Sequence, residues 1–587
     1  MFESCRDRFF FLFIKIPEID LIVLVTLTEY FFFSALKNSE FGTEDFFRVI
    51  KRRFFSFLSV IIFVFFSRTQ KNFGETCILQ LVQTDVITFG LFILLILGIS
   101  IFASRKKETN EEDYFLAGRK LTWWTIGLSL IASNISTEHF VGMAGRGHAI
   151  GLAIASYEWM AAVTLILVSA IFLPRFMALK IYTIPQYLEH RFGSKVRIIM
   201  ACMMLLAYIF VTLASVLYSG AVTLQTIFGM NLTVGIWSIG LLAGLYTIYG
   251  GLQAVVWSDV VQGVTLLIGG ALVTWFGVQE LGGWSVFWEL SSDQMHTVMP
   301  WDHPEMPWVA VFIGGLWIPN IFYWGLNQFI CQRTLGAKSL DEGQKGILFA
   351  AFIKLFIPFI IIFPGIIAFH LYGNKIDSSD MAYPFMINHI LPVGLRGIML
   401  AALFGAVMST LDSVINSAST IFTIDLYKKF RPETSPLDLV KIGRYSTAFF
   451  VVFGCLWAPV IAGQGSVFQY IQMFWGFVTP GLVACFLFGF FTVSTPQGAA
   501  ILGMGLNIPV YGALLWSFPQ MAFLHHMGLT FALICLAMVA YTHFYPRKEF
   551  DPGEKFQLHE VFSQNSSLNK IRLLIVSCTV FLYIMFY

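Results

Sequence analysis

The sequence predicts an all-α integral membrane protein with about fourteen transmembrane helices. Of its 587 residues, 57% are hydrophobic and only 12% are charged, which is about half the charged share that is usual in soluble proteins. The mean hydropathy is +0.74. A soluble domain of this size could not cover so much apolar surface with polar groups, and the same composition excludes a disordered chain.

Long apolar runs with few charges recur along the chain, and each matches the roughly 20 residues that a spanning helix needs. The longest, 445–545, contains no Asp, Glu, Lys or Arg, and turn residues near Gly463, Pro496 and Pro519 divide it into four. The runs are too long for barrel strands and lack a two-residue alternation. The fourteen predicted crossings are 86–104, 121–144, 150–173, 198–228, 232–249, 252–279, 307–332, 346–372, 397–424, 445–462, 466–491, 497–517, 520–545 and the short run 573–587.

The charges of the connecting loops predict the orientation. Lys and Arg gather in the loops 174–197 and 425–444, whereas the loop 280–306 carries five acidic residues and no Lys or Arg. Because short basic loops stay on the cytoplasmic side, we expect the first two inside and the third outside. A path that alternates through fourteen helices satisfies all three loops.

The first 80 residues form an N-terminal extension that we expect to stand apart from the transmembrane domain, 81–587. They are rich in Phe, Lys and Arg, and their apolar runs are too short or too charged to span a bilayer clearly. They do not end in the small-residue cleavage site that a signal peptide requires. An extra anchor and an upstream stretch from a wrong start codon both remain open.

The helix predicted over 121–144 has a polar centre. Six of the seven residues from Ser133 to His139 are polar. A polar seam between helices is one reading, but Glu138 and His139 are adjacent and would face different sides of a regular helix. A discontinuous helix fits better, because its unwound backbone can coordinate a cation and its ends can meet a substrate.

Two ionisable residues interrupt otherwise apolar helices. Glu158 lies in the crossing 150–173, and Lys354 lies in the run 346–372. Each costs roughly 2.5–3.5 kcal/mol inside a membrane by insertion scales, so each is a functional candidate. Together they either form a structural ion pair between two helices or share a polar, hydroxyl-rich ligand.

The crossing 397–424 carries hydroxyl groups suited to Na⁺. Ser409, Ser413 and Asn416 share one helical stripe, and Thr410 follows Ser409. Such hydroxyls often only bond back to their own helix. Two acidic residues, Asp412 and Asp259, are further candidates, although Asp259 near a helix start would be favoured there in any case.

A second break is predicted in the crossing 307–332, at Pro319 and Asn320, because proline removes a helical hydrogen bond. The two interrupted helices each open a set of five. This is the inverted-repeat pattern of secondary transporters, with a binding site near the midplane. We expect the repeats over about 121–279 and 307–491.

Several long motifs resemble the solute:sodium symporter family. The stretch from Glu112 through Ser136 resembles its opening, and four others resemble its sodium/glucose cotransporter branch, above all the bacterial sodium/galactose cotransporters. The likeness covers roughly 80–587. The four motifs are Ile150–Met160, Tyr249–Asp259, Gln332–Ser339 and Asn416–Asp425.

The resemblance implies a LeuT-like core of five plus five helices with flanking helices, and transport by alternating access. It implies that a monosaccharide and Na⁺ bind at separate sets of residues, listed by role as follows. The Na⁺ ligands are Ala132, Ile135, Ala406, Ser409 and Thr410; the sugar contacts are Glu158, Asn320, Lys354 and Gln472, with His139 and Asn134 beside them; the inner gate is Tyr323, and the outer gate is Met143, Tyr157 and Phe468.

This chain departs from the bacterial pattern at two places. His139 stands where the bacterial proteins have Gln and the animal sugar cotransporters have His, and Ala161 replaces a serine of the sugar site. These changes leave the preferred sugar epimer open.

The predicted function is therefore a Na⁺-driven importer of a monosaccharide of the galactose or glucose type, multi-pass in the cell inner membrane. The alternative is a symporter of the same family for an amino acid, a vitamin or a polyol such as myo-inositol. Na⁺, the sugar and the lipid bilayer are the expected partners; no cofactor is expected, and the net charge of +2 gives no nucleic-acid footprint. An ion channel would need a ring of like groups around a wet pore, and the polar residues of this chain are single and unlike one another. An enzyme would need a nucleophile–base set or a metal cluster, and the histidines of this sequence show no metal-binding spacing with acidic residues.

Overall fold

The computed structural model describes residues 82–103, 111–136, 138–228, 230–376, 379–463, 467–547 and 566–587. All of them belong to one compact unit, 78–587. Within these ranges the chain is helical, and the extended pairings are two isolated bridges, Leu121 with Ala337 and Met299 with Pro307. The predicted extension, 1–80, lies outside the described residues.

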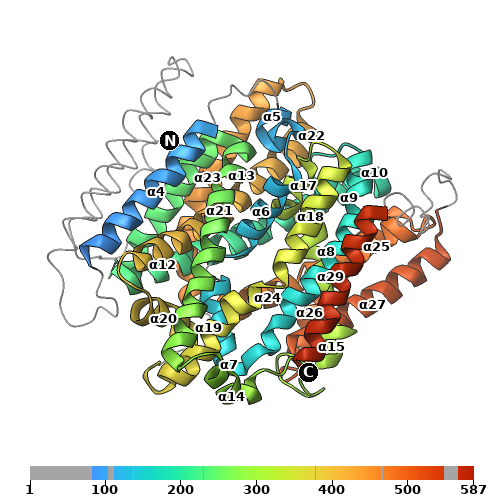
Figure 1. Cartoon of the computed structure of the whole chain (residues 1–587). Coiled ribbons are helices and arrows are strands. Elements are labelled where there is room, and N and C mark those ends of the chain that lie inside the picture. Colours follow the sequence, from blue (N-terminus) through green and yellow to red (C-terminus); the bar gives the residue numbers. More distant parts are fainter. Residues whose placement is uncertain are drawn as a thin grey trace, which may run out of the picture. The chain divides into compact units, whose positions relative to one another are not determined.

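Figure 1 shows the helices of the unit, coloured along the chain. The first part of the unit contains α4 (Gln83–Ala103), α5 (Glu111–Leu116), α6 (Trp123–Asn134), α7 (Ala144–Ile150), α8 (Ser156–Leu167), α9 (Leu173–Ala178), α10 (Ile184–Phe192), α11 (Ser194–Ala207), α12 (Ala214–Phe228), α13 (Leu232–Leu281) and α14 (Trp284–Leu290). The second part contains α15 (Trp308–Phe312), α16 (Trp317–Ile321), α17 (Gln328–Leu335), α18 (Leu340–Lys354), α19 (Ile357–Tyr372), α20 (Ala382–Ile390), α21 (Leu395–Thr420), α22 (Lys428–Phe430), α23 (Pro436–Trp457), α24 (Val467–Gly476), α25 (Thr479–Phe491), α26 (Gln497–Ser517), α27 (Phe523–Phe544) and α29 (Ser566–Met585).

Ten helices of the described chain are long and apolar enough to cross a membrane, or eleven if a bent pair near residues 470–491 is one span. The predicted number of fourteen therefore stays a prediction. The last crossing is longer than the apolar run 573–587 suggests, because α29 begins at Ser566 and includes Lys570 and Arg572 in its first turns.

The long helical stretch α13 reverses direction, so that its two halves lie side by side. A side chain at Gly220 would lie 2.7 Å from Val407 and 3.0 Å from Ile239, while Gln262 lies about as close to Gly405. In a straight helix Ile239 and Gln262 would be about 35 Å apart, yet both border the same turns of α21. Two crossings in this stretch, as the sequence predicts, fit this arrangement.

The helices that carry the polar residues of interest lie in the middle of the unit. Nearly every described side chain of α21 is buried, from Gly397 through Thr420, and so is most of α6. By contrast, α26, α27 and α29, grouped along one side in Figure 1, expose many large apolar side chains, such as Leu536 and Phe581. An apolar exterior around a core with buried polar groups is the expected pattern of a membrane protein.

Candidate functional site

The first broken helix is present, as the sequence predicts. Helix α6 ends at Asn134, Ile135 is extended with φ −76° and ψ 101°, and a π-helical segment, η3 (Glu138–Met143), follows. The backbone N–H of Glu138 donates to the Ser136 hydroxyl at 3.2 Å. The side chain of Ser136 thus replaces a helical acceptor, which allows the helix to stop inside the membrane.

The second break is present, but the predicted position at Pro319 is wrong. Pro319 is the third residue of α16, where a missing N–H costs nothing because first-turn N–H groups have no helical partner. The chain leaves the helix at Asn327, which is extended with φ −81° and ψ 119°. The Tyr208 hydroxyl donates to the Asn327 side chain there, and α17 starts again at Gln328.

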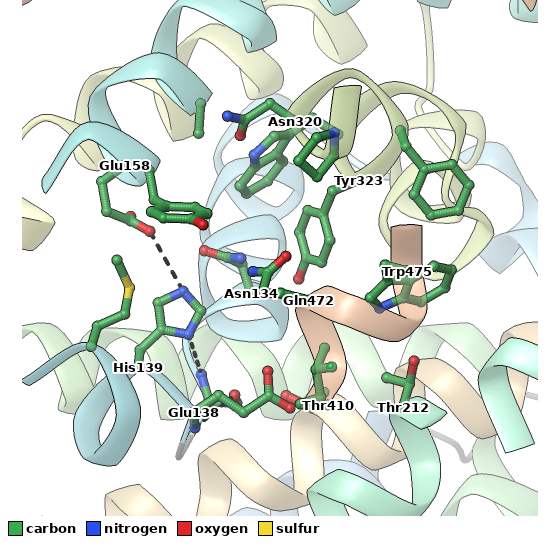
Figure 2. A pocket seen from close by; sticks show the side chains of 18 of the residues that line it. Asn134, Glu138, His139, Glu158, Thr212, Asn320, Tyr323, Thr410, Gln472 and Trp475 are labelled. Carbon is green, nitrogen blue, oxygen red and sulfur yellow. Dashed lines mark hydrogen bonds and ion pairs between the residues drawn. The ribbon is translucent and has the colours of Figure 1, made fainter. Parts of the chain in front are cut away.

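A cavity of about 120 Å³ lies between the two broken helices, several times the roughly 10–15 Å³ that one water requires. Ten of the residues predicted for the sugar, ion or gate roles line it. They are Asn134, His139, Met143, Tyr157, Glu158, Asn320, Tyr323, Lys354, Thr410 and Gln472. Figure 2 shows Tyr323, Asn134 and Gln472 close together beside the space, with Glu158 and His139 across from them. The side chain of Phe468, the remaining gate residue, is outside the described residues.

The predicted Glu158–Lys354 pair forms at the cavity wall. The Lys354 ammonium lies 2.5 Å from the Glu158 carboxylate and also donates to the side-chain oxygen of Asn134. His139 approaches the other Glu158 oxygen at 3.5 Å (Figure 2). Both charged side chains are almost completely buried. A helix that breaks at Asn134 is therefore connected through Lys354 to a carboxylate on α8.

One further contact of Lys354 could not be read from the sequence. Its ammonium lies 5.0 Å from the ring centre of Trp324, which also lines the cavity. A cation above an indole face is attracted by the ring quadrupole. Trp324 was missed because aromatic residues in membranes are usually packing residues. Other lining residues without a predicted role include Glu138, Thr212, Trp475 and Thr479.

The residues predicted to bind Na⁺ are divided between α6 and α21, and all five are buried. Thr410 joins the two helices, because its hydroxyl lies 3.1 Å from the Ala406 carbonyl and 3.4 Å from the Ser133 carbonyl. Of the five, only Thr410 also lines the cavity. Ala132 and Ile135 lie at the end of α6, just before and within its break.

Ser409 belongs to a second buried network, centred on Asp259. The Ser409 hydroxyl donates to one Asp259 oxygen at 2.5 Å, and Ser129 and Ser133 donate to the other at 2.5 and 3.1 Å. The guanidinium of Arg333 lies 2.8 Å from that second oxygen. The network joins α6, α13, α17 and α21 in one place.

Two members of this network were missed by sequence reasoning, Ser129 and the charged residue Arg333. Arg333 also donates to Ser129 and Ser413, at 2.6 and 2.5 Å, and to the carbonyl of Phe329. Its signal was the presence of one Arg and one Asp in apolar surroundings, since buried charges are paired. Their sequence separation of 74 residues hid the pairing.

Asp412, the other acidic candidate, has a different environment. One of its oxygens accepts a hydrogen bond from the Thr247 hydroxyl at 2.7 Å. Its second oxygen has no hydrogen-bond partner among the described residues. Asp412 is therefore not part of the Asp259 network, although it lies on α21, the helix from which Ser409 donates to Asp259.

Comparisons with known proteins agree with this architecture. Residues 114–506 match the profile of the sodium:solute symporter family. The chain is 42% identical over 488 residues to a sodium/glucose cotransporter of Vibrio parahaemolyticus, covering 78% of this chain and 90% of that protein. It is 35% identical over 464 residues to sodium/myo-inositol cotransporter 2 of Sus scrofa, covering 72% and 68% of the two chains.

Among solved structures, a Na⁺-coupled sialic acid symporter in a substrate-bound outward-open state superposes with a TM-score of 0.72. It covers 80% of this chain and 100% of the symporter, at 22% sequence identity. This likeness confirms the predicted LeuT-like helical fold; the bounds of the two repeats stay a prediction. The chain is a multi-pass membrane protein and belongs to the sodium:solute symporter family, a family of transporters and not of enzymes.

Proposed function

We propose that this protein is a Na⁺-driven symporter that imports a monosaccharide of the galactose or glucose type by alternating access. The observation that carries the proposal is the buried Glu158–Lys354 pair on the wall of a cavity between two broken helices. The 42% identity to a sodium/glucose cotransporter supports the same substrate class.

The chemistry of the cavity suits a neutral, hydroxyl-rich ligand. A carboxylate accepts hydrogen bonds and an ammonium donates them, and the side-chain amides of Asn320 and Gln472 do both. Each sugar hydroxyl also both donates and accepts. An amino acid would bring an ammonium and a carboxylate, which need counter-charges that Glu158 and Lys354 already give to each other. Tyr323 beside Asn134 is proposed as the inner gate, and Met143, Tyr157 and Phe468 as the outer gate.

We assign the Na⁺ site to the junction of α6 and α21, with carbonyls of Ala132, Ile135 and Ala406 and hydroxyls of Ser409 and Thr410. Hard oxygen ligands suit this ion, and the broken end of α6 supplies carbonyls that a continuous helix would use internally. Na⁺ entry down its gradient, with roughly 2.3 kcal/mol per charge for each 100 mV, then drives the sugar uphill. Coupling requires that Na⁺ and sugar favour the same conformation, and it is reciprocal.

A polyol substrate is the second candidate, because relatives that transport myo-inositol by name are 35% identical to this chain. The test is uptake of radiolabelled galactose, glucose and myo-inositol into proteoliposomes, with an inward Na⁺ gradient and with K⁺ in its place. We expect Na⁺-dependent accumulation of a monosaccharide. Accumulation of myo-inositol alone would support the second candidate, and equal uptake in K⁺ would contradict Na⁺ coupling.

The proposed orientation, in the cell inner membrane, has its own test. Single cysteines introduced at 425–444 should react with an impermeant reagent only from the cytoplasm, and those at 285–300 only from outside. Labelling of both from the same face would mean that the number of crossings between them is wrong.

A further inference from the structure

We propose that Trp159 is a positioning residue for the sugar site, and that the last helix, α29, holds it in place. Trp159 follows Glu158 on α8 and has no exposed surface. It does not line the cavity, so it acts through its neighbours. This inference rests on the proposed function, because it concerns how the Glu158–Lys354 pair is aligned for a sugar.

Trp159 makes a second connection beside the ion pair. Its indole N–H donates to the carbonyl of Leu355 at 3.2 Å, and Leu355 follows Lys354. Two adjacent residues of α8 therefore bind two adjacent residues at the end of α18. Glu158 forms an ion pair with Lys354, and Trp159 donates a hydrogen bond to the backbone carbonyl of Leu355. Two adjacent connections fix the register and the rotation of one helix against the other, which a single flexible ion pair cannot do.

The Leu355 carbonyl is free to accept this bond because the regular helical hydrogen bonds are interrupted between α18 and α19. In a regular helix it would accept from the N–H of Phe359. Here that N–H donates to Phe356 at 3.1 Å, and Leu355 itself donates to Phe352 at 3.2 Å, so the backbone forms tighter turns between α18 and α19. Pro358, which has no N–H, follows in the first turn of α19. A buried carbonyl without a partner is costly, and the indole of Trp159 supplies the missing donor.

The ring of Trp159 packs against the end of α29 and against Phe586, which follows that helix. The rings of Tyr583 and Phe586 lie 5.1 and 6.0 Å from that of Trp159, the first edge-on. Phe586 is itself fixed, because its carbonyl accepts from the N–H and the hydroxyl of Thr297, at 2.9 and 2.8 Å. Its ring also stacks on Trp288 at 6.1 Å.

A continuous series of contacts therefore connects Thr297, in the loop before α15, with the Glu158–Lys354 pair. It passes through Phe586 and Trp159. Aromatic contacts of this kind stabilise both partners beyond simple burial. We infer that a change at Trp159, or in the α29 residues that pack against it, shifts Lys354 relative to Glu158 and weakens sugar binding, while the ion site on α21 is unaffected.

The experiment compares Trp159→Phe with Trp457→Phe in proteoliposomes. Trp457 packs on Phe210, with ring centres 4.9 Å apart, and its indole N–H has no partner among the described residues. The same substitution there removes similar volume but no hydrogen bond. We expect Trp159→Phe to raise the sugar concentration for half-maximal uptake about three- to tenfold, the effect of one hydrogen bond. The Na⁺ concentration for half-maximal uptake and the maximal rate should stay within about twofold, and Trp457→Phe should change none of these quantities.

Two α29 variants and one loop variant keep the proposal testable if Trp159→Phe folds poorly. Tyr583→Phe retains the ring and should raise the half-saturating sugar concentration less than Tyr583→Ala does. Tyr583→Ala and Thr297→Val should raise it without changing the half-saturating concentration of Na⁺. Equal sugar dependence in Trp159→Phe and Trp457→Phe, or a parallel loss of Na⁺ affinity, would overturn the positioning role. Wild-type protein that accumulates no monosaccharide would instead contradict the proposed function itself.

Discussion

Two of the buried ion pairs in the described part of the chain, Asp259–Arg333 and Glu158–Lys354, differ in how many other hydrogen-bond partners the protein gives them. The Asp259 carboxylate accepts three hydroxyl groups in addition to Arg333, and the guanidinium donates to two hydroxyls and a carbonyl as well. Neither residue lines the cavity. Glu158 and Lys354 make fewer contacts with the protein, and both face the cavity.

This difference separates a structural joint from a binding site. A buried charge is tolerated only when its hydrogen-bonding capacity is met. In the Asp259–Arg333 pair the protein meets nearly all of it, so a ligand has little to add. In the Glu158–Lys354 pair, part of the hydrogen-bonding capacity is not used by the protein and is available to a ligand in the cavity. The degree of internal satisfaction, rather than burial alone, distinguishes the two pairs.

The largest effect is expected from Asp259→Asn. The change leaves the Arg333 guanidinium buried without its counter-charge, and losing one member of a buried pair costs about 3–5 kcal/mol of stability. We expect a much lower thermal unfolding temperature of the purified protein. Asp438→Asn, which removes the carboxylate of an exposed pair with Lys441, is the control and should change it little. An unaltered unfolding temperature in Asp259→Asn would mean that the pair is not a joint.

Glu158→Gln should act on ligand binding. It keeps the size of the side chain but removes the charge and leaves Lys354 unpaired, which typically costs roughly 2–5 kcal/mol in binding. Sugar affinity, measured on purified protein, should fall by at least about tenfold. Na⁺ binding without sugar should change much less. Wild-type sugar affinity, or an equal loss of Na⁺ affinity, would make this pair a structural joint too.

Ser409→Ala tests whether the edge of the Asp259 network also serves the ion. The hydroxyl is proposed as a Na⁺ ligand, and it now donates to Asp259. Its removal should raise the Na⁺ concentration for half-maximal uptake about three- to tenfold while the protein still inserts. An unchanged Na⁺ dependence would exclude Ser409 from the ion site and assign it to the joint alone.

The smallest effect is expected from His139→Gln. The imidazole lies 3.5 Å from Glu158, which is a weak contact compared with that of Lys354. An amide can still donate to the same carboxylate oxygen. We expect sugar affinity to change by no more than about threefold, as measured by competition of galactose and of glucose against a labelled sugar. A tenfold loss would give His139 a central role in the pair.

The sequence was informative where a polar or charged residue interrupts an apolar spanning helix. Glu158 and Lys354 were visible because each interrupts an apolar run. The break after Asn134 was visible because six polar residues lie within about two helical turns. Pairing between distant helices was not visible: nothing near Asp259 indicates Arg333, since the contact exists only after α13 and α17 pack. The effect of Pro319 was misjudged because its consequence depends on which turn of a helix it occupies.

The Asp259–Arg333 joint also has a consequence for the order in which the chain is made. Arg333 follows Asp259 by 74 residues and Ser409 follows it by 150. At the usual synthesis rate of about 5–20 residues per second, Asp259 is in the nascent chain about 4–15 seconds before Arg333 and about 8–30 seconds before Ser409. During that interval the hydroxyls of Ser129 and Ser133, which precede Asp259 in the chain, are the partners already made. The joint is therefore complete only after the second half of the bundle has been synthesised, and Asp259 gains its counter-charge only once Arg333 has been made.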